Sequence, residues 1–208
     1  MNRKLATPEA INMLISSIAE SIGWKYSESG RYIKKTVGDL LFEISFKSSK
    51  YNTSYKRIEV IADFDIYYKK FGKLPASNVI AWVSYRSDKY WYDITTEKDL
   101  KRTFKILEKE IKNTAVDLCD HFETDYISAV NSLLNEHFYE YHVFFDFLAD
   151  QLGISAIEQR AREIYEKASD ETKRQIADYK NGKADKGWMI KRDNFRFIVD
   201  NDLIPNDK

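Results

Sequence analysis

Three histidines and one cysteine are the side chains that could bind a transition metal or act in covalent catalysis. Cys119, His121 and Glu123 alternate along the chain, but positions i, i+2 and i+4 do not all share one face of a helix. His137 and His142 are five residues apart, and neither zinc-finger nor His-Glu-x-x-His spacing occurs. An acid-rich helical setting disfavours Cys119 as a nucleophile. We therefore expect structural roles for these residues and no metal site.

A second group of residues has the composition of a magnesium-dependent nuclease, which needs carboxylates and a lysine converging on one ion. Glu43 and Lys47 lie four residues apart, as do Asp65 and Lys69. A strand keeps positions i and i+4 on one face, yet its rise separates them by about 13 Å, too far for one metal site. These side chains fit better as polar residues on the solvated face of a sheet.

Other catalytic signatures are absent from the sequence. There is no Gly-x-Ser-x-Gly turn that would present a nucleophilic serine. The seven glycines form neither a phosphate-binding loop nor a dinucleotide-binding fingerprint. We therefore expect a protein that is not an enzyme and uses no cofactor.

The acids considered above for a magnesium site lie in two runs in which apolar and other residues alternate. From Leu40 to Phe46 and from Ile58 to Ile66, every second residue is apolar. Successive side chains of a strand point to opposite faces, so each run predicts a strand with one buried side. The polar segment between the runs predicts the loop of an antiparallel pair. The other side must be solvated or meet basic groups, because unpaired buried carboxylates are costly; it carries Glu43, Glu59, Asp63 and Asp65.

Local periodicities place the remaining elements around this pair. A first helix is expected from Thr7, as its cap, to Ile22, with Gly23 as its end. Further strands are expected over 24–26, 31–37, 79–86 and 90–94. Further helices are expected from 95–96 to beyond 118, and over 127–152 as two helices broken near Asn135 or as one bent helix. A helix over 154–168 is expected to bury a stripe that begins with Ile154. The last helices are expected over 170–180 and about 187–200, the latter packing through Trp188, Phe195 and Ile198.

This order of elements predicts an α+β fold, with an antiparallel sheet and an N-terminal helix followed by a helical C-terminal part. We divide the chain at Thr124 into an α+β sheet domain, residues 1–123, and a helical C-terminal subdomain, residues 124–208. A single cysteine excludes a disulfide framework within the chain. There is no secretory signal and no run of about 20 apolar residues, so we expect a soluble cytoplasmic protein that does not enter a membrane.

Charge is distributed unevenly although the formal net charge is zero. Residues 1–95 carry 15 Lys and Arg against 10 Asp and Glu, whereas residues 96–208 carry 18 against 23. The segment from Asn113 to Gln159 contains nine acids and no Lys or Arg. Such asymmetry bears on partners rather than on fold. The compensating positive charge has two open origins, the basic sheet half of the same chain or a partner.

The acid-only segment also holds eight aromatic residues, more than one helical stripe can bury. Some aromatic surface must therefore meet other helices or a partner. Complementary charge would speed association with a basic partner, and an aromatic side chain would supply a buried anchor. If the segment is helical, its exposed side carries the residues that we predict to bind this partner: Glu136, Tyr139, Glu140, Asp146 and Asp150.

The alternative surface is the sheet half, where basic and aromatic residues interleave. Stacking together with phosphate contacts would suit single-stranded nucleic acid. This half is only mildly basic, and lysines also protect the edges of sheets, so we do not expect nucleic acid as the main partner. The residues concerned are Lys34, Lys35, Lys50, Lys56, Arg57, Lys69, Lys70, Arg86 and Lys89, with Tyr51, Tyr55, Tyr67, Trp82 and Tyr90.

Several short patterns between residues 7 and 123 occur together. They are Ile22-Gly23-Trp24 at the end of the first helix, Asp39-Leu40 before Phe42-x-Ile44-x-Phe46, Ser48-Ser49, and Trp91-Tyr92-Asp93-Ile94 leading into a helix. In these patterns the chain resembles an uncharacterised bacterial family, the domain of unknown function 4304. It departs from the family at Phe46, where the family has a Gln before the Lys-Ser at the strand end. No catalytic residue carries over, and the helices after about residue 125 lie outside the resemblance.

The resemblance implies an α+β fold and, because the family occurs beside bacterial toxin genes, a role in immunity to a toxin. We therefore expect a non-catalytic interaction protein, most concretely a toxin-neutralising immunity protein that binds a basic partner such as a toxin. A nucleic-acid-binding or nuclease-like accessory protein is the alternative. The sequence gives no indication of the oligomeric state.

Overall fold

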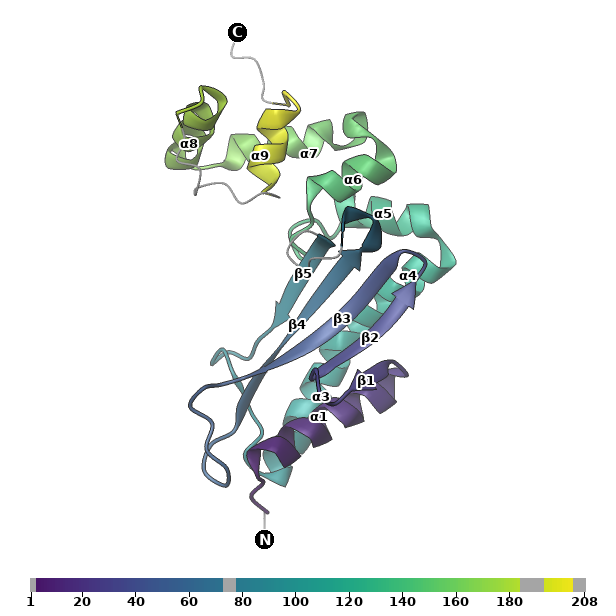
Figure 1. Cartoon of the computed structure of the whole chain (residues 1–208), viewed down its shortest axis with the longest axis vertical. Helices are drawn as coiled ribbons and strands as arrows, with labels where there is room; N and C mark the ends of the chain where they lie inside the picture. The colour runs from purple at the N-terminus through teal and green to yellow at the C-terminus, as the bar shows by residue number, and fades with distance from the viewer. Residues whose placement is uncertain (1–2, 73–77, 184–192, 204–208) are drawn as a thin grey trace.

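The computed structural model describes residues 3–72, 78–183 and 193–203, and it has the predicted α+β architecture. Figure 1 shows an elongated molecule in which a twisted sheet occupies one end and the C-terminal helices gather at the other. An N-terminal helix precedes the sheet, and the later helices follow it in the chain. None of the helices in the described part of the chain is long and apolar enough to cross a membrane.

The sheet contains six strands, and every pairing between them is antiparallel. The strand order is β1-β2-β3-β4-β5, and β6 pairs with the start of β4. β3 and β4 are the two strands with the clearest alternation, and β3 pairs with β4 along its whole length. The bounds are β1 (Lys25–Ser27), β2 (Tyr32–Val37), β3 (Leu40–Ser48), β4 (Glu59–Tyr68), β5 (Val79–Tyr85) and β6 (Tyr92–Asp93).

One face of the sheet is covered by helices. In Figure 1 α3 and α4 run along the far side of the strands, and α1 packs beside α3. The alternating apolar residues of β3 and β4 point into this layer, where the Phe42 ring lies 5.7 Å from the Phe122 ring of α4. The N-terminus of α3 is capped by the Thr96 side chain, which accepts the Asp99 N–H. The bounds are α1 (Thr7–Ile22), α3 (Glu97–Ile111), a π-helical turn (Lys112–Val116) and α4 (Asp117–Thr124).

The C-terminal helices begin after a cap at Asp125, whose side chain accepts the Ser128 N–H. The predicted break near Asn135 is confirmed, because α5 ends there and α6 begins only at Phe145. The bounds are α5 (Tyr126–Asn135), α6 (Phe145–Leu152), α7 (Ile154–Lys167), α8 (Asp170–Lys180) and α9 (Asn194–Asp200), and a short 3₁₀ helix, η1 (Lys69–Phe71), follows β4.

The segment 136–144 between α5 and α6 is not helical and lies against the outer edge of β5. The Trp82 N–H donates to the Tyr141 carbonyl at 2.7 Å, and the Phe144 N–H donates to the Ile80 carbonyl at 2.9 Å. An uncovered strand edge invites pairing with other chains, so this segment protects the edge of the sheet.

Aromatic residues of the C-terminal helices complete the core of the sheet. The Tyr141 ring lies 6.2 Å from the Phe64 ring, and the Phe147 ring lies 5.3 Å from the Tyr68 ring. Of the eight aromatic residues in the acid-only segment, Tyr139 alone is exposed, at 52%. The hydrophobic core therefore runs across residue 124, and the division of the chain into two units there stays a prediction.

Some predicted details are wrong. Thr7 does not cap the first helix, because Ala6 occupies that position and its N–H donates to the Glu9 carboxylate at 3.3 Å. The Thr7 N–H instead donates to the Ser54 hydroxyl at 3.0 Å. Ile154 was expected in a buried stripe but is 43% exposed at the start of α7. The last helix begins at Asn194, and the expected packing of Trp188 lies outside the described residues.

Candidate functional site

The face of the sheet opposite the helices carries a row of titratable and aromatic side chains. Strand residues alternate between faces, so the neighbours of buried Phe42 and Phe64 point away from the helices. In Figure 1 no described helix lies over the near side of β2, β3 and β4. We call this the open face; it comprises Tyr32, Lys34, Glu43, Ser45, Lys47, Asp63, Asp65, Tyr67, Trp82 and Ser84.

Two carboxylates occupy facing positions at the centre of the open face. Glu43 of β3 lies directly opposite Asp65 of β4 in the strand register. Cβ atoms of such pairs lie only about 4.5–5.5 Å apart, and like charges there destabilise a sheet. Burial raises the pKa of Glu43, and Lys34, its partner in the β2 register, opposes that rise. The pair is therefore a point of unfavourable electrostatics.

Asp65 is the more strongly perturbed member of the pair. Burial, and then repulsion by Asp63, raises the pKa of Asp65 to about 6. Lys47 and a hydrogen bond with the Tyr67 hydroxyl oppose the rise without cancelling it. A raised carboxyl pKa means that the folded protein disfavours the negative charge at this position. A positive charge brought close to Asp65 would relieve this penalty.

Asp63 is the most buried of the acids, with 6% of its surface exposed. It forms an ion pair with Lys47 and accepts a hydrogen bond from the Ser84 hydroxyl. A buried carboxylate that is paired and hydrogen-bonded keeps its charge at modest cost. Asp63 is therefore held in place beside Asp65, and its negative charge is one of the causes that raise the pKa of Asp65.

Two stacked aromatic side chains, Trp82 and His142, lie beside the carboxylate pair on the β5 side. Trp82 faces Asp65 in the β4–β5 register, and its indole stacks on the His142 ring with centroids 4.2 Å apart and planes 13° apart. Carboxylates beside an aromatic face suit an ammonium or guanidinium group, which gains ion pairing from the acids and cation–π attraction from the ring. The carboxylates and the indole of the open face thus have the chemistry that suits a cationic group.

The titratable clusters considered from the sequence do not form metal sites. Among the described residues, no group of three or more His, Cys, Asp or Glu side chains is placed to hold a metal ion. Cys119 is buried, and burial raises the pKa of its thiol to about 12. His121 hydrogen-bonds the Ser128 hydroxyl at 3.0 Å, and His137 hydrogen-bonds Glu140 at 2.9 Å. These residues have structural contacts with their neighbours.

The five residues predicted to bind a partner do not form one helical surface. Glu136, Tyr139 and Glu140 lie in or next to the non-helical segment that covers β5, so their placement on a helix was wrong. The segment forms turns instead, and the backbone of Tyr141 and of Phe144 bonds to the β5 edge. Asp146 was expected to be exposed but is half-buried at the start of α6. Asp150 is exposed and accepts a hydrogen bond from the Tyr68 hydroxyl at 3.2 Å.

Tyr139 is exposed, but cations of its own chain already approach its ring. The Arg160 guanidinium lies 5.5 Å and the Lys167 ammonium 5.7 Å from the ring centroid. Arg160 also donates to the carbonyls of Leu134 and Asn135 at the end of α5. Positive charge therefore surrounds the predicted aromatic anchor, which weakens its attraction for a basic partner.

The chain itself supplies part of the positive charge that the acid-only segment needs. Lys35 of β2 reaches Glu123 at 2.8 Å and Asp120 at 3.5 Å. The hydrogen bond to Glu123 raises the pKa of Lys35. Arg162 reaches Glu158 at 3.4 Å. For Glu123, Asp120 and Glu158 the compensating positive charge therefore comes from the same chain and not from a partner. The sheet half supplies it to Glu123 and Asp120, and α7 supplies it to Glu158.

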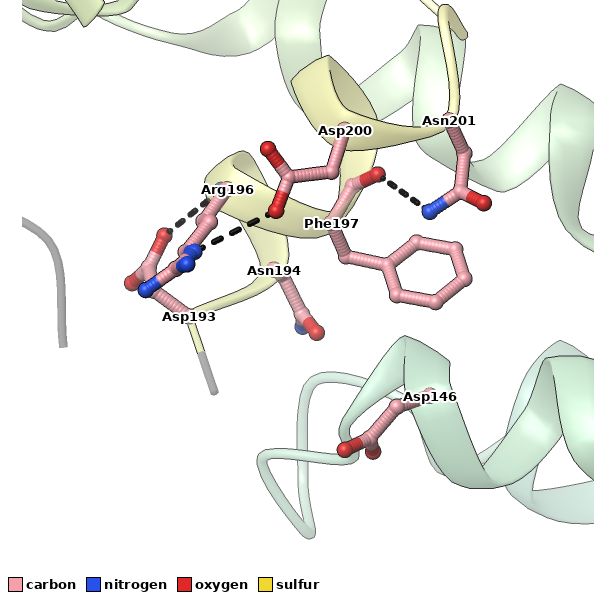
Figure 2. Close-up of a pocket in the computed structure, with 7 residues that line it drawn as sticks. All are labelled: Asp146, Asp193, Asn194, Arg196, Phe197, Asp200 and Asn201. Carbon is pink, nitrogen blue, oxygen red and sulfur yellow. Dashed lines mark hydrogen bonds and ion pairs between the residues drawn. The ribbon is translucent and has the colours of Figure 1, made fainter. Parts of the chain in front are cut away.

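Figure 2 shows a small pocket of about 90 Å³ between α6 and α9. Polar side chains of this pocket attach α9 to the start of α6. The Asn194 side chain accepts the Phe145 N–H and donates to the Val143 carbonyl, both at 2.8 Å. Arg196 reaches Asp200 at 3.2 Å, and Asp193 caps the helix. The pocket, which includes the predicted residue Asp146, is therefore structural.

Comparisons with protein-family models, with curated proteins and with solved structures each found no match. The alternation in the sequence places Glu43, Asp63 and Asp65 on one polar face, which was expected to be solvated or to meet basic groups. Lys47 and Lys34 do lie beside Asp63 and Glu43. The signal that would have singled them out is the register, which sets Glu43 against Asp65 and Trp82 beside them.

Proposed function

We propose that this protein is a non-catalytic interaction protein that binds a basic protein partner, and that the open face is its binding surface. The observation that carries the proposal is the facing Glu43–Asp65 pair at the centre of an uncovered sheet face. Carboxylates with perturbed pKa values cluster at functional sites, so this pair is a functional candidate. The proposal moves the binding surface from the helices to the sheet.

A lysine or arginine of the partner is the group that this geometry favours. Placed between Glu43 and Asp65, it would convert a repulsive pair into two attractive contacts in a partly desolvated setting. Arginine also matches the planar Trp82 ring, because a guanidinium stacks on aromatic faces while it hydrogen-bonds carboxylates. Fixed Asp63 adds to the negative potential, and Tyr67 supplies a hydroxyl at the edge. The partner segment would therefore present an exposed arginine or lysine.

Neutralisation of a bacterial toxin, the role that the family resemblance implies, is one setting in which such a protein would act. The nucleic-acid alternative is not favoured on this face, because carboxylates at its centre repel phosphate. The cations predicted to form that alternative surface are also dispersed. Lys34 lies on the open face, Lys35 pairs with α4, and Lys50 and Lys70 lie beyond opposite ends of β3 and β4.

A paired-variant capture experiment tests the proposal. The immobilised protein is incubated with extract of its native host, and bound proteins are identified with and without added salt. The wild type should retain a basic protein that salt elutes, and Glu43→Gln/Asp65→Asn should lose it. The control Glu136→Gln/Glu140→Gln removes the same charge from the surface first predicted and should retain the protein. Loss in the control and retention in the open-face variant would place binding on the helical surface and overturn the proposal.

The non-catalytic part of the proposal has its own test. The purified protein should not hydrolyse DNA, RNA or nucleotides in the presence of magnesium or manganese. Turnover that disappears in Asp63→Asn while the circular dichroism spectrum is unchanged would show that the open-face acids are catalytic. Such a result would replace the interaction role with an enzymatic one.

A further inference from the structure

The outward side of α3 carries a stripe of cations that the functions discussed so far do not use. Its members recur at spacings of three and four residues and are exposed: Lys98, Lys101, Arg102, Lys105 and Lys109. Residues at such spacings share one face of a helix. We call this stripe the basic ridge of α3. The helix lies on the opposite side of the sheet from the open face.

The acids of α3 do not neutralise this stripe, because each has a partner elsewhere or at the stripe's margin. Glu97 pairs with Arg3 at 3.4 Å, and Glu108 pairs with Lys112 at 2.8 Å. Glu110 accepts a hydrogen bond from the Tyr92 hydroxyl at 3.0 Å. Asp99 alone reaches a stripe residue, Arg102, at 3.2 Å.

Three lysines that follow one another at intervals of four residues along the stripe have no neutralising contact in the described part of the chain. Within residues 3–72, 78–183 and 193–203, Lys101, Lys105 and Lys109 have neither an ion pair nor a hydrogen bond from their side chains. Lysines four apart on a helix repel each other by a few tenths of a kcal/mol. A bound polyanion would remove this repulsion.

A pocket opens directly beside the stripe, between α3 and the loop that joins β5 to β6. Its volume is about 400 Å³, within the range of small-molecule sites, and Trp91, Arg102 and Ile106 are among its lining residues. The loop is fixed by Ser87, whose hydroxyl donates to the Trp91 carbonyl at 2.6 Å. Tyr90, the chain neighbour of Trp91, is 45% exposed; its ring lies 5.8 Å from the Trp91 ring and 4.1 Å from the Arg86 guanidinium. The pocket is therefore a recess with aromatic lining next to a row of cations.

The pocket has charges of both signs, whereas the stripe has cations alone. Three acids line the pocket, Asp88, Asp93 and Glu59, together with two cations, Lys89 and Arg102, and Glu59 pairs with Arg57. Carboxylates repel phosphate but accept hydrogen bonds from the amino groups of bases. A nucleotide would therefore place its base in the pocket and its phosphates on the lysines of α3. An acidic polypeptide would gain from the lysines but has no group suited to the acidic, aromatic recess.

We propose that α3 and the adjacent pocket form a binding site for single-stranded nucleic acid, with the backbone along Lys101, Lys105 and Lys109 and a base stacked in the Trp91 pocket. Aromatic stacking combined with a basic track is the usual basis of sequence-tolerant single-strand binding. The site is separate from the proposed protein-binding face, and the two would be occupied independently.

Fluorescence anisotropy with labelled single-stranded DNA and RNA of about 15 nucleotides tests this site. The wild-type affinity should fall with salt, with a log–log slope of about −0.7 for each phosphate contact. Lys101→Gln/Lys105→Gln/Lys109→Gln should reduce that slope by about 2. The matched control Lys50→Gln/Lys56→Gln/Lys69→Gln loses the same charge from the sheet half and should bind like the wild type. Trp91→Leu should weaken binding about tenfold with the slope unchanged.

Other occupants of the ridge give different results in the same experiment. Equal displacement of the oligonucleotide by polyglutamate, together with no effect of Trp91→Leu, would show a general polyanion surface and overturn the proposal. Concentration-dependent self-association in sedimentation, abolished by the α3 variant, would show that the open face of a second copy is the occupant instead. Undetectable binding at low salt, or binding lost only in the control variant, would also overturn it.

Discussion

Three acids lie together at the centre of the open face, and lysines gather on the outward side of α3, but the two surfaces hold these charges differently. On the open face Asp63 is 6% exposed, and burial shifts the pKa of Asp65. On α3 the lysines are exposed, so solvent and salt screen them. Repulsion between buried charges lowers the free energy of unfolding, whereas repulsion between exposed charges has little effect on folding and mainly favours ligands of opposite charge.

The largest expected effect is a gain in stability from removing one buried charge. Asp65→Asn keeps the size of the side chain and removes its repulsion from Glu43 and Asp63. A carboxyl pKa of about 6 in place of 3.8 corresponds to about 3 kcal/mol of unfolding free energy at neutral pH. Urea denaturation should show a gain of this order. The exposed-acid control Glu136→Gln should change stability by less than about 0.5 kcal/mol.

The pH dependence of the same variant checks the cause. The folded-state pKa of Asp65 lies above its unfolded value, so the folded protein binds more protons between about pH 4 and pH 6. The Asp65 contribution to stability therefore falls as pH rises through this window and is constant above it. The advantage of Asp65→Asn over the wild type should vanish below about pH 4. An advantage that persists there would have a different origin from charge.

The next largest effect is a smaller gain in stability from reversing one exposed charge on α3. Lys105→Glu turns two repulsive pairs, with Lys101 and Lys109, into attractive ones and should stabilise the protein by at most about 1 kcal/mol at low salt. The gain should disappear in about 1 M salt, where the Debye length is about 3 Å. Melting temperatures of Lys105→Glu and of the loop control Lys56→Glu measure this difference. If the Asp65→Asn gain is equally sensitive to salt, the contrast between buried and exposed charge is wrong.

The smallest effect is expected at Tyr139. Its ring is 52% exposed and contacts Arg160, Lys167 and the neighbouring Phe138 ring, so Tyr139→Ala should reduce stability by about 1 kcal/mol or less. Its effect on the dissociation rate of the captured basic partner, measured by surface plasmon resonance, is the sharper readout. We expect no change in that rate. Dissociation faster by tenfold or more would restore Tyr139 as the anchor.

The sequence predicted the site's ingredients but not their arrangement. Alternation was enough to place Glu43, Asp63 and Asp65 on one polar face, because side-chain direction in a strand is a local property. It could not show which residue of β3 faces Asp65, since register depends on two strands meeting. The stacking of His142 on Trp82 joins residues 60 positions apart in the chain, and no local pattern reports such a contact.

The sequence by itself determined the α+β class, the first helix, the β3–β4 pair and the break after Asn135, because periodicity, caps and turn residues act over a few positions. The tertiary structure decided that 136–144 covers β5 and is not a continuous helix, since the Tyr141 carbonyl and the Phe144 N–H bond to the β5 edge. It also decided which charges remain unpaired. The spacing of the α3 lysines is visible in the sequence. The contacts of Glu97 with Arg3 and of Glu110 with Tyr92, which keep these acids from neutralising the lysines, form only in the folded chain.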